Sequence, residues 1–524
     1  MSQEGEPRPS RYGLLLGLVL LLALGLRGLE FFDPWAGEGF KSAFGGFASG
    51  AHARGLAQHG LAESGGLPFY WRLEYADGSV EHDLYTHHPA FYALLSAGSL
   101  KLFGFHEWAL RLPWALASLL AILSVARWMR LVWGERVALV GALLLAVVPL
   151  SSWWGTLVWV DGLLVALYGR VLERWVRWLR DGEARHLRAA ACWFFAGGLV
   201  DWPMAFLLPG LLLQGAARLW GRGGWRACLP LGLLPAATLA SVLVHRAHMA
   251  LAVPAQRVQT DTEHTLSSVM SLPVSLGTFL GFQLDYALLY LTEAVFVLVL
   301  LGLGRDLWRW SRARLSAEQG LALVALPPGL LYVALFPSRS VNHSFFLFVS
   351  LPAFAAFAAQ VLIGAADALR GRSAAVARVV CPLALLALTA ACVWRHLECW
   401  ALEKRPWMRR TVESEWLAPI VNDERAVVLG APCNALGFHF YSAAPVLGHI
   451  TSSAQLLDLR HKRLMRLGED RRVVFLFHTS LVGVLPELAA FLRATVEPQL
   501  QLEYDQQGFG FAVFDLTDWV RESG

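Results

Sequence analysis

The stretch Thr86–Ser118, THHPAFYALLSAGSLKLFGFHEWALRLPWALAS, decides how the rest of the chain is placed. Two histidines stand directly before an apolar run at 89–106, which begins with Pro89, and a second apolar run covers about residues 108–131. A membrane-spanning helix needs about 20 apolar residues, which the second run provides. If the first run also spanned a membrane, every later segment would change sides, so the charges along the chain have to decide.

The composition indicates a polytopic membrane protein. Of the 524 residues, 56% are hydrophobic and 16% are charged, whereas soluble domains carry about 25% charged residues. The net charge of +4 does not indicate a nucleic-acid partner, because the basic residues cluster beside apolar runs. The partner that these runs imply is the lipid bilayer. The six cysteines have no CxxC spacing and are typical of buried thiols.

The apolar runs predict about eleven transmembrane helices. We expect them at about residues 12–29, 108–131, 136–152, 156–178, 187–201, 203–219, 227–246, 284–304, 318–336, 344–364 and 379–399. Every second connection is rich in arginine, at Arg127, Arg130, Arg136, Arg170, Arg174, Arg177, Arg180, Arg218, Arg222, Arg226, Arg305, Arg309, Arg312, Arg314, Arg370, Arg372 and Arg378. Cytoplasmic connections are enriched in Lys and Arg, so these connections and the N-terminus are expected inside. The run at 89–103 then does not span, and we expect a helix that lies along the outer surface.

This sidedness puts the first loop, residues 30–107, and the C-terminal tail outside the membrane. In the tail, 425–430, 472–480 and 509–516 read as strands, and 452–468 and 485–496 read as helices between them. We therefore expect a transmembrane domain over residues 1–403, loop included, and an extracytoplasmic α/β domain over residues 404–524. The predicted fold class is a polytopic α-helical protein, multi-pass in the cell (inner) membrane, with a C-terminal soluble α/β domain.

Polar residues in or beside the spans gather on the outer side in this topology. Such residues are costly in a membrane and often functional. The outward set is Asp33, Glu38, His82, Asp83, His87, His88, Asp161, Asp201, Asp261, Glu263, His264, Asp285, Arg339, Asn342 and His343. Asp161 lies one turn into an apolar span, where an unpaired carboxylate costs about 3 kcal/mol or more. We expect Asp161 to belong to a substrate site; a structural hydrogen bond to a neighbouring span is the alternative.

Four stretches resemble the GT-C class of integral membrane glycosyltransferases. They are Thr86–Ser118, WVDGLLVALY around Asp161, GLVDWPMAFLLPGLLL around Asp201, and ARGLAQHGL at Ala53–Leu61. Within that class they are similar to the dolichyl-phosphate-mannose protein mannosyltransferase and lipid A aminoarabinose transferase superfamily (glycosyltransferase family 39-like). The resemblance covers roughly residues 10–220, and the rest of the chain is similar only in architecture.

The resemblance implies a hexosyl- or pentosyltransferase that moves a sugar from a polyprenyl-phosphate carrier to a protein, lipid or glycan acceptor at the outer face. In this reaction a carboxylate takes the acceptor's proton while the anomeric carbon is displaced with inversion. A cation stabilises the departing lipid phosphate. Because Arg or Lys can serve as that cation, a divalent metal is compatible with the reaction but not required, and no cofactor is certain.

The expected catalytic base is missing from its usual place. Many members of the superfamily carry an Asp-Glu pair about nine residues before the "AR" of ARGLAQHGL, where this chain has Gly45 and Gly46. Glu38 is our preferred base, with Asp161 and Asp33 as the other catalytic candidates. A solvated surface role for Glu38 is the alternative.

The basic residue expected to bind the donor's phosphate is also missing from its usual place. Many relatives have Lys where this chain has Asp201 in "DWP". We expect Arg54 or Arg339 to bind the phosphate, with Lys41 behind them. The alternative for Arg339 is that it simply flanks a span. Asp201 itself counts among the substrate-binding candidates.

The polar stretch before the surface helix is expected to line the same cavity, as the resemblance implies. His87 and His88 are then donors to a phosphate or a sugar hydroxyl, and Asp83 and His343 complete the substrate-binding candidates. A metal site made by His82, Asp83 and His87 is the alternative, but its spacing matches no standard zinc pattern.

Two other functions stay open. A transporter or flippase of lipid-linked sugars would usually show internal repeats and charged residues near the membrane midplane, and we find neither in the sequence. A non-catalytic GT-C relative is suggested by the missing Asp-Glu pair.

Overall fold

The computed structural model describes residues 11–32, 49–252, 274–341, 343–403, 423, 425–430, 446–447, 450–467, 469–478, 485–496, 500–503 and 510–521. The chain divides into two compact units, and each is described by itself. The helical unit comprises Met1–Asp33, His87–Tyr92 and Arg111–Ala401. The mixed unit comprises Pro34–Thr86, Ala93–Leu110 and Leu402–Gly524.

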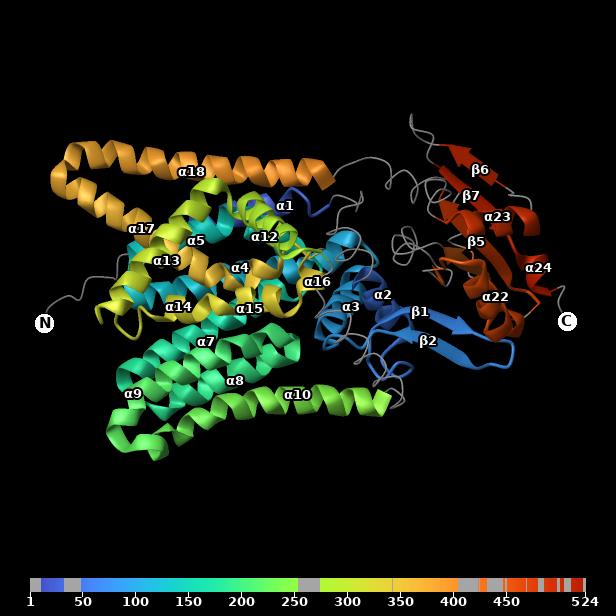
Figure 1. The fold of residues 1–524 in the computed structure, drawn as a ribbon, viewed down its shortest axis with the longest axis horizontal. Helices are drawn as coiled ribbons and strands as arrows, with labels where there is room; N and C mark the ends of the chain where they lie inside the picture. Colours follow the sequence, from blue (N-terminus) through green and yellow to red (C-terminus); the bar gives the residue numbers. More distant parts are fainter. Residues whose placement is uncertain are drawn as a thin grey trace, which may run out of the picture. The chain divides into compact units, whose positions relative to one another are not determined.

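The helical unit is a bundle of long apolar helices (Figure 1). Its main members are α1 (Arg11–Gly28), α4 (Glu107–Trp133), α5 (Glu135–Val147), α7 (Asp161–Asp181), α8 (Ala184–Val200), α9 (Leu208–Cys228), α10 (Leu233–Ala252), α12 (Leu276–Leu291), α13 (Glu293–Ser311), α15 (Pro327–Leu335), α17 (Leu351–Arg372) and α18 (Ala374–Glu403). Helices α7, α8 and α10 pack in sequence against one another, and α17 packs against both α5 and α13.

Five helices among the described residues are long and apolar enough to cross a membrane. They are Arg11–Gly28, Glu107–Trp133, Gly224–Ala252, Phe346–Arg372 and Ala374–Ala401. Two bent helix pairs raise the number to seven if each pair is one span. A multi-pass membrane protein is therefore confirmed, while the count of eleven spans stays a prediction. Helix α7 falls outside this set because acids and arginines interrupt its apolar surface.

The predicted spans at 136–152 and 284–304 are each two helices. The first breaks at Val148, directly before Pro149, and bends by 66°. Proline disfavours helical geometry in the residue before it, which accounts for this break. The second breaks at Thr292, which has a φ of 69°, and bends by 106°. A β-branched residue rarely adopts positive φ. Tertiary packing, and not the intrinsic backbone preference of Thr292, therefore stabilises this bend.

A buried arginine joins the first helix to the bundle. Arg27 has no exposed surface, yet all three of its guanidinium nitrogens have acceptors. They donate to the Ser118 hydroxyl at 2.8 Å, to the Ser151 carbonyl at 2.9 Å and to the Ala23 carbonyl at 3.1 Å. A buried charge is tolerated when hydrogen bonds replace its water, so Arg27 fixes α1 against α4 and the segment after α5.

The mixed unit contains a five-stranded sheet in the tail. Its order is β4–β3–β5–β7–β6, with β3 (Ala426–Gly430) parallel to β4 (Val446–Leu447) and β5 (Arg472–His478). Strand β7 (Gly510–Asp515) is antiparallel to β5 and to β6 (Leu500–Glu503). Strands β3, β5 and β7 and helices α22 (Ser453–Lys462) and α23 (Pro486–Thr495) fall within the predicted segments; β4 and β6 were not predicted. The extent of this domain, 404–524, stays a prediction.

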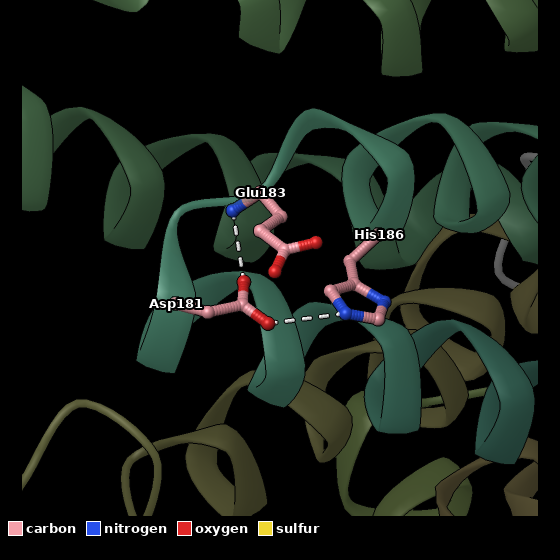
Figure 2. A group of neighbouring side chains, drawn as sticks. All are labelled: Asp181, Glu183 and His186. Atoms are coloured by element: carbon pink, nitrogen blue, oxygen red, sulfur yellow. Dashed lines mark hydrogen bonds and ion pairs between the residues drawn. The ribbon is translucent and has the colours of Figure 1, made fainter.

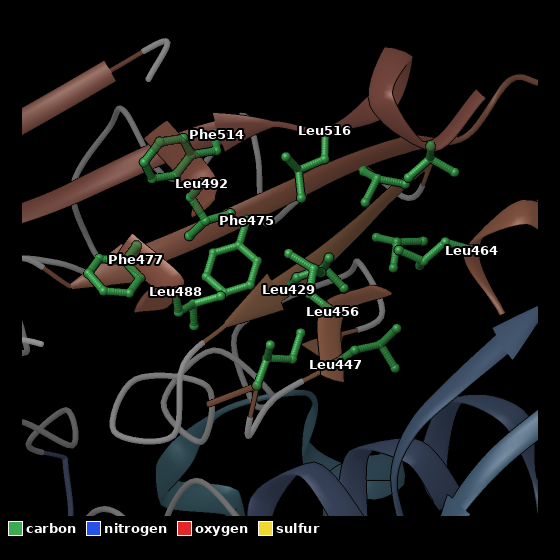
Figure 3. Close-up of a cluster of buried hydrophobic side chains, with 14 of the residues drawn as sticks. Leu429, Leu447, Leu456, Leu464, Phe475, Phe477, Leu488, Leu492, Phe514 and Leu516 are labelled. Carbon is green, nitrogen blue, oxygen red and sulfur yellow. The ribbon is translucent and has the colours of Figure 1, made fainter. Parts of the chain in front are cut away.

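The sheet shares its hydrophobic core with the first loop. Strands β1 (Phe69–Glu74) and β2 (Val80–Leu84) form an antiparallel hairpin, which follows helix α2 (Ser49–His59) and precedes the apolar helix α3 (Phe91–Phe103). Trp71, Leu73 and Tyr75 of the hairpin segment belong to the same buried cluster as the tail residues drawn in Figure 3.

Polar contacts add to this junction between hairpin and tail. Arg463 pairs with Glu81 at 2.8 Å, and Arg466 donates to the Ser79 hydroxyl at 3.0 Å. The Ala76 amide also donates to the carbonyl of Arg466. Two segments that share a core lie on the same side of a membrane, as the sequence-based topology requires for the loop and the tail.

Candidate functional site

Asp201 connects the end of α8 to the segment around His88. Its backbone is extended, which ends α8, and its carboxylate accepts the Trp202 amide at 2.8 Å and so caps the 3-10 helix η3 (Trp202–Leu207). The same carboxylate oxygen lies 2.9 Å from Nδ1 of His88. The Trp202 ring nitrogen donates to the His87 carbonyl at 3.2 Å. Asp201 is fully buried, so this pair fixes the orientation of the His88 ring.

Aromatic rings surround the His88–Asp201 pair. The His88 ring lies edge-on to Trp159 with a centroid distance of 5.0 Å, and Tyr92 packs on the same tryptophan at 4.8 Å. The ring of His245 lies edge-on to Trp202 at 5.0 Å. The Asp201 side chain is 1% exposed and that of His88 is 21% exposed, and burial strengthens the electrostatic interaction between such groups.

Asp161 lies beside the same pair. It is the first residue of α7, where the helix dipole favours a negative charge. It is 5% exposed and interacts electrostatically with Asp201. The Tyr168 hydroxyl, which both carboxylates influence, donates to the Pro203 carbonyl. In the described part of the chain, one oxygen of Asp161 and one of Asp201 have no hydrogen-bond partner, so the two acids leave polar capacity for a ligand.

Arg339 and His343 complete the group. Arg339 belongs to the short helix α16 (Pro337–Ser340) and its side chain is exposed, without an acceptor among the residues that the structure describes. Its carbonyl accepts Nδ1 of His343 at 2.8 Å. Burial lowers the pKa of His343 to about 3, so this ring is neutral at physiological pH. Both Arg339 and His88 lie near enough to His343 to affect it electrostatically.

Five predicted site residues therefore come together in the helical unit, although the sequence separates them by up to 255 positions (88 to 343). They are His88, Asp161, Asp201, Arg339 and His343. Their catalytic and binding roles stay predictions, because geometry alone does not assign them.

The other predicted site residues are placed elsewhere or not described. Arg54 on α2 is half-buried, and Asp83 lies on β2; both belong to the mixed unit. His87 is exposed beside His88. Other predicted positions lie outside the described residues, namely Asp33, Glu38, Lys41, Asp261, Glu263, His264 and Asn342.

The aromatic walls were not predicted as part of the site. Trp159 and Trp202 each lie next to or near an acid that was selected, within "WVD" and "DWP". That proximity is the only sequence signal for them, because tryptophan is common at membrane interfaces for other reasons.

A metal-like cluster occurs at the other end of α7. Among the described residues, the ligand atoms of Asp181, Glu183 and His186 lie within 4.8 Å of one another (Figure 2). Asp181 accepts the Glu183 amide at 2.8 Å and pairs with His186 Nε2 at 3.1 Å. These bonds close the turn between α7 and α8, which also needs a positive φ at Gly182. We therefore interpret the cluster as one that stabilises this turn and not as a metal site. His82, from the predicted metal alternative, instead lies 3.5 Å from Glu63.

Comparisons with known proteins show what the fold is similar to. The fold is similar to those of ArnT and of an archaeal oligosaccharyltransferase, in line with the resemblance seen in the sequence. Residues 87–248, which contain His88, Asp161 and Asp201, match the family model described as "Dolichyl-phosphate-mannose-protein mannosyltransferase". No curated protein matches the sequence.

Solved structures match nearly the whole chain. The structure of ArnT from Cupriavidus metallidurans bound to undecaprenyl phosphate has a TM-score of 0.60 at 15% identity, and the match covers 96% of this chain and 97% of that one. The Archaeoglobus fulgidus oligosaccharyltransferase in the apo form has a TM-score of 0.56 at 13% identity, covering 96% and 74%. The archaeal oligosaccharyltransferase AglB from Archaeoglobus fulgidus, in complex with an inhibitory peptide and a dolichol-phosphate, has a TM-score of 0.55 at 13% identity, also covering 96% and 74%. At these identities the matches establish the fold.

Proposed function

We propose that this protein is a membrane glycosyltransferase that moves a sugar from a polyprenyl-phosphate carrier to a lipid, protein or glycan acceptor on the outer face of the membrane. One observation carries the proposal: two buried acids, Asp161 and Asp201, lie beside His88 and near an exposed arginine, Arg339. The matched family is named for transfer from dolichyl-phosphate-mannose, and two matched structures contain a polyprenyl phosphate.

Arg339 is the proposed ligand for the donor's phosphate. A guanidinium presents a planar fork that suits a phosphate, and the side chain of Arg339 has no acceptor in the described residues. His88, which Asp201 holds through Nδ1, is proposed to donate to the phosphate or to a sugar hydroxyl. Asp201 would then be a positioning residue and not a group that reacts.

Removal of the acceptor's proton needs a carboxylate at the outer edge of the site. Glu38 remains the proposed base, with Asp161 and Asp33 as the other candidates. Asp161 is supported as a site residue by its burial and its vacant oxygen, whereas Glu38 is supported by the sequence alone. Arg54, Asp83 and His87 remain proposed substrate contacts of the first loop.

The proposed location is the cell (inner) membrane with the loop and the tail outside. The shared core of hairpin and tail supports a common side for both. The arginine-rich connections support the opposite side as cytoplasmic.

Two measurements on the purified full-length protein test this proposal. The first is binding of undecaprenyl phosphate to the wild type, to Arg339→Ala and to Arg370→Ala, an exposed arginine of the predicted inner side. We expect a loss of roughly tenfold or more in Arg339→Ala alone, since hydrogen bonds to charged groups contribute about 1.5–3 kcal/mol. Equal affinity in all three proteins would remove Arg339 from the site.

The second measurement is transfer from a panel of radiolabelled polyprenyl-phosphate sugars, with Glu38→Gln and Asp161→Asn as variants. Loss of transfer with retained lipid binding would identify the base. Lipid binding without transfer of any sugar by the wild type would instead indicate a non-catalytic relative.

A further inference from the structure

A strongly basic cavity lies at the end of α7 that is far from Asp161. It encloses about 660 Å³ between the last turns of α4 and the second half of α7. Six arginines line it, namely Arg127, Arg130, Arg170, Arg174, Arg177 and Arg180, with Glu173 as the only acid in the lining. Six positive charges against one negative charge leave the lining at +5.

Four of the six arginines already have acidic partners. Arg170 and Arg177 both pair with the buried carboxylate of Glu173, at 2.6 and 2.9 Å. Arg130 pairs with Glu135 at 2.6 Å, and Arg180 binds both oxygens of Glu318 at 2.7 to 3.0 Å. These pairs hold the walls of the cavity in place.

The other two arginines are uncommitted. Within the described residues, neither Arg127 on α4 nor Arg174 on α7 has a hydrogen-bond acceptor or an acidic partner, and Nε of Arg174 is a buried atom. A buried donor without a partner is costly, and two guanidiniums facing one cavity repel each other. An anion with several acceptor oxygens would satisfy both requirements.

The packing of α4 on α7 makes this cavity a fixed feature. A Cβ on Gly169 would lie 2.7 Å from Ser124, and one on Gly162 would lie 3.3 Å from the Ser118 amide. The glycines thus let the two helices approach closely along their length, and their ends bring Arg127 and Arg174 to one place.

The location favours a lipid phosphate. Helix α7 has 21 residues, which at 1.5 Å per residue is about 30 Å, the thickness of the hydrocarbon core. The arginines of α7 that line the cavity therefore lie about 14 to 28 Å along the helix from Asp161, on the side where the arginine-rich connections are expected. Basic pockets between transmembrane helices on that side bind the phosphates of anionic lipid headgroups.

We propose that the cavity between α4 and α7 is a second, non-catalytic site for a phosphate-bearing ligand, with Arg127 and Arg174 as its ligands and an anionic phospholipid headgroup as its occupant. This inference does not depend on the proposed transferase activity, because it rests on other residues at the opposite end of the helix. The volume of the cavity is in the range of ordinary ligand sites, about 300–1,000 Å³.

Lipid retention by the purified full-length protein tests the site. The protein is offered equal amounts of phosphatidylglycerol and phosphatidylcholine in detergent, and retained lipids are counted by native mass spectrometry. Arg127→Gln/Arg174→Gln removes the two ligands. Arg372→Gln/Arg378→Gln is the matched control, because it removes two charges from the same predicted side, outside the cavity.

We expect the wild type and the control to prefer phosphatidylglycerol and the double variant to lose about thirtyfold in affinity, from about 1 kcal/mol for each arginine. If the double variant is unstable, Arg127→Gln alone replaces it, because Arg127 is exposed. This single variant should lose about fivefold in affinity for phosphatidylglycerol. An equal loss in the control would show unspecific attraction and overturn the proposal.

A parallel arm distinguishes the source of the phosphate. Inorganic pyrophosphate is added to the lipid-free protein, and the thermal unfolding temperature is measured. Pyrophosphate could raise the unfolding temperature of the wild type but not of the double variant, while the wild type shows no preference for phosphatidylglycerol. That result would support a phosphate site whose occupant is a soluble ligand and not a lipid. No effect of either probe would overturn the site.

Discussion

The pair of His88 and Asp201 allows the sharpest test of the site's architecture. Asp201→Ala removes two hydrogen bonds, the one to His88 at 2.9 Å and the one from the Trp202 amide at 2.8 Å. The bond to the charged carboxylate contributes about 1.5–3 kcal/mol, and the cap contributes about 1 kcal/mol. We therefore expect the free energy of unfolding to fall by about 3 kcal/mol. Asp201→Asn keeps an acceptor for the amide and should lose about 2 kcal/mol.

A double-mutant cycle isolates the pair itself. His88→Ala, Asp201→Ala and the combined variant are unfolded in the same detergent, and tryptophan fluorescence follows the transition. We expect a coupling energy of about 2 kcal/mol, since both partners lie in one hydrogen-bonded group. Asp285→Ala, an exposed acid of the same predicted side, should change stability by less than about 0.5 kcal/mol. A coupling below about 0.5 kcal/mol would refute the argument that this pair fixes the His88 segment.

Three further perturbations test the fold around the site. Arg27→Met should lower the free energy of unfolding by about 3 kcal/mol, because it leaves buried acceptors without their donor; stability equal to the wild type would show that Arg27 is dispensable. Gly169→Ala should cost about 1–3 kcal/mol, since its Cβ would lie 2.7 Å from Ser124, whereas Gly17→Ala, with nothing within 4 Å, should cost nothing; denaturation of both variants compares them. The pKa of His343 is lowered to about 3 by burial, below its ordinary value of about 6.5. The folded state therefore binds fewer protons, so stability should be full above pH 6.5 and fall as the pH drops below it. Thermal unfolding at pH 7 and pH 5 should show this loss in the wild type and less of it in His343→Gln; identical pH dependence would contradict it.

Much of the site could be predicted because charge in a membrane is costly. Asp161 and Asp201 were selected as outward acids, and both lie in one buried group. Their pairing with His88 could not be predicted, since it joins positions 113 residues apart through packing of helices. No local sequence pattern specifies such a contact.

Local sequence signals explain which features of the fold could be predicted. Pro149 marks a helix break in the sequence, and the break occurs directly before it. Thr292 gives no such signal, because its positive φ is imposed by the surrounding structure. The hairpin had a usable signal, an Asp77–Gly78 turn between two alternating segments. The sites of close helix approach at Gly162 and Gly169 also depend on a partner that the sequence does not name.

The core shared by hairpin and tail has a consequence for how the protein is made. Trp71 leaves the ribosome more than 350 residues before Val427, its neighbour in the buried cluster. The apolar face of the hairpin therefore stays exposed while the helical unit is synthesised and inserted. Closing such a long chain segment makes folding of this unit slow and exposes it to aggregation in the meantime. Completion of the mixed unit is thus a late, post-translational step, and a chain that stops before the tail leaves Trp71 and Tyr75 exposed.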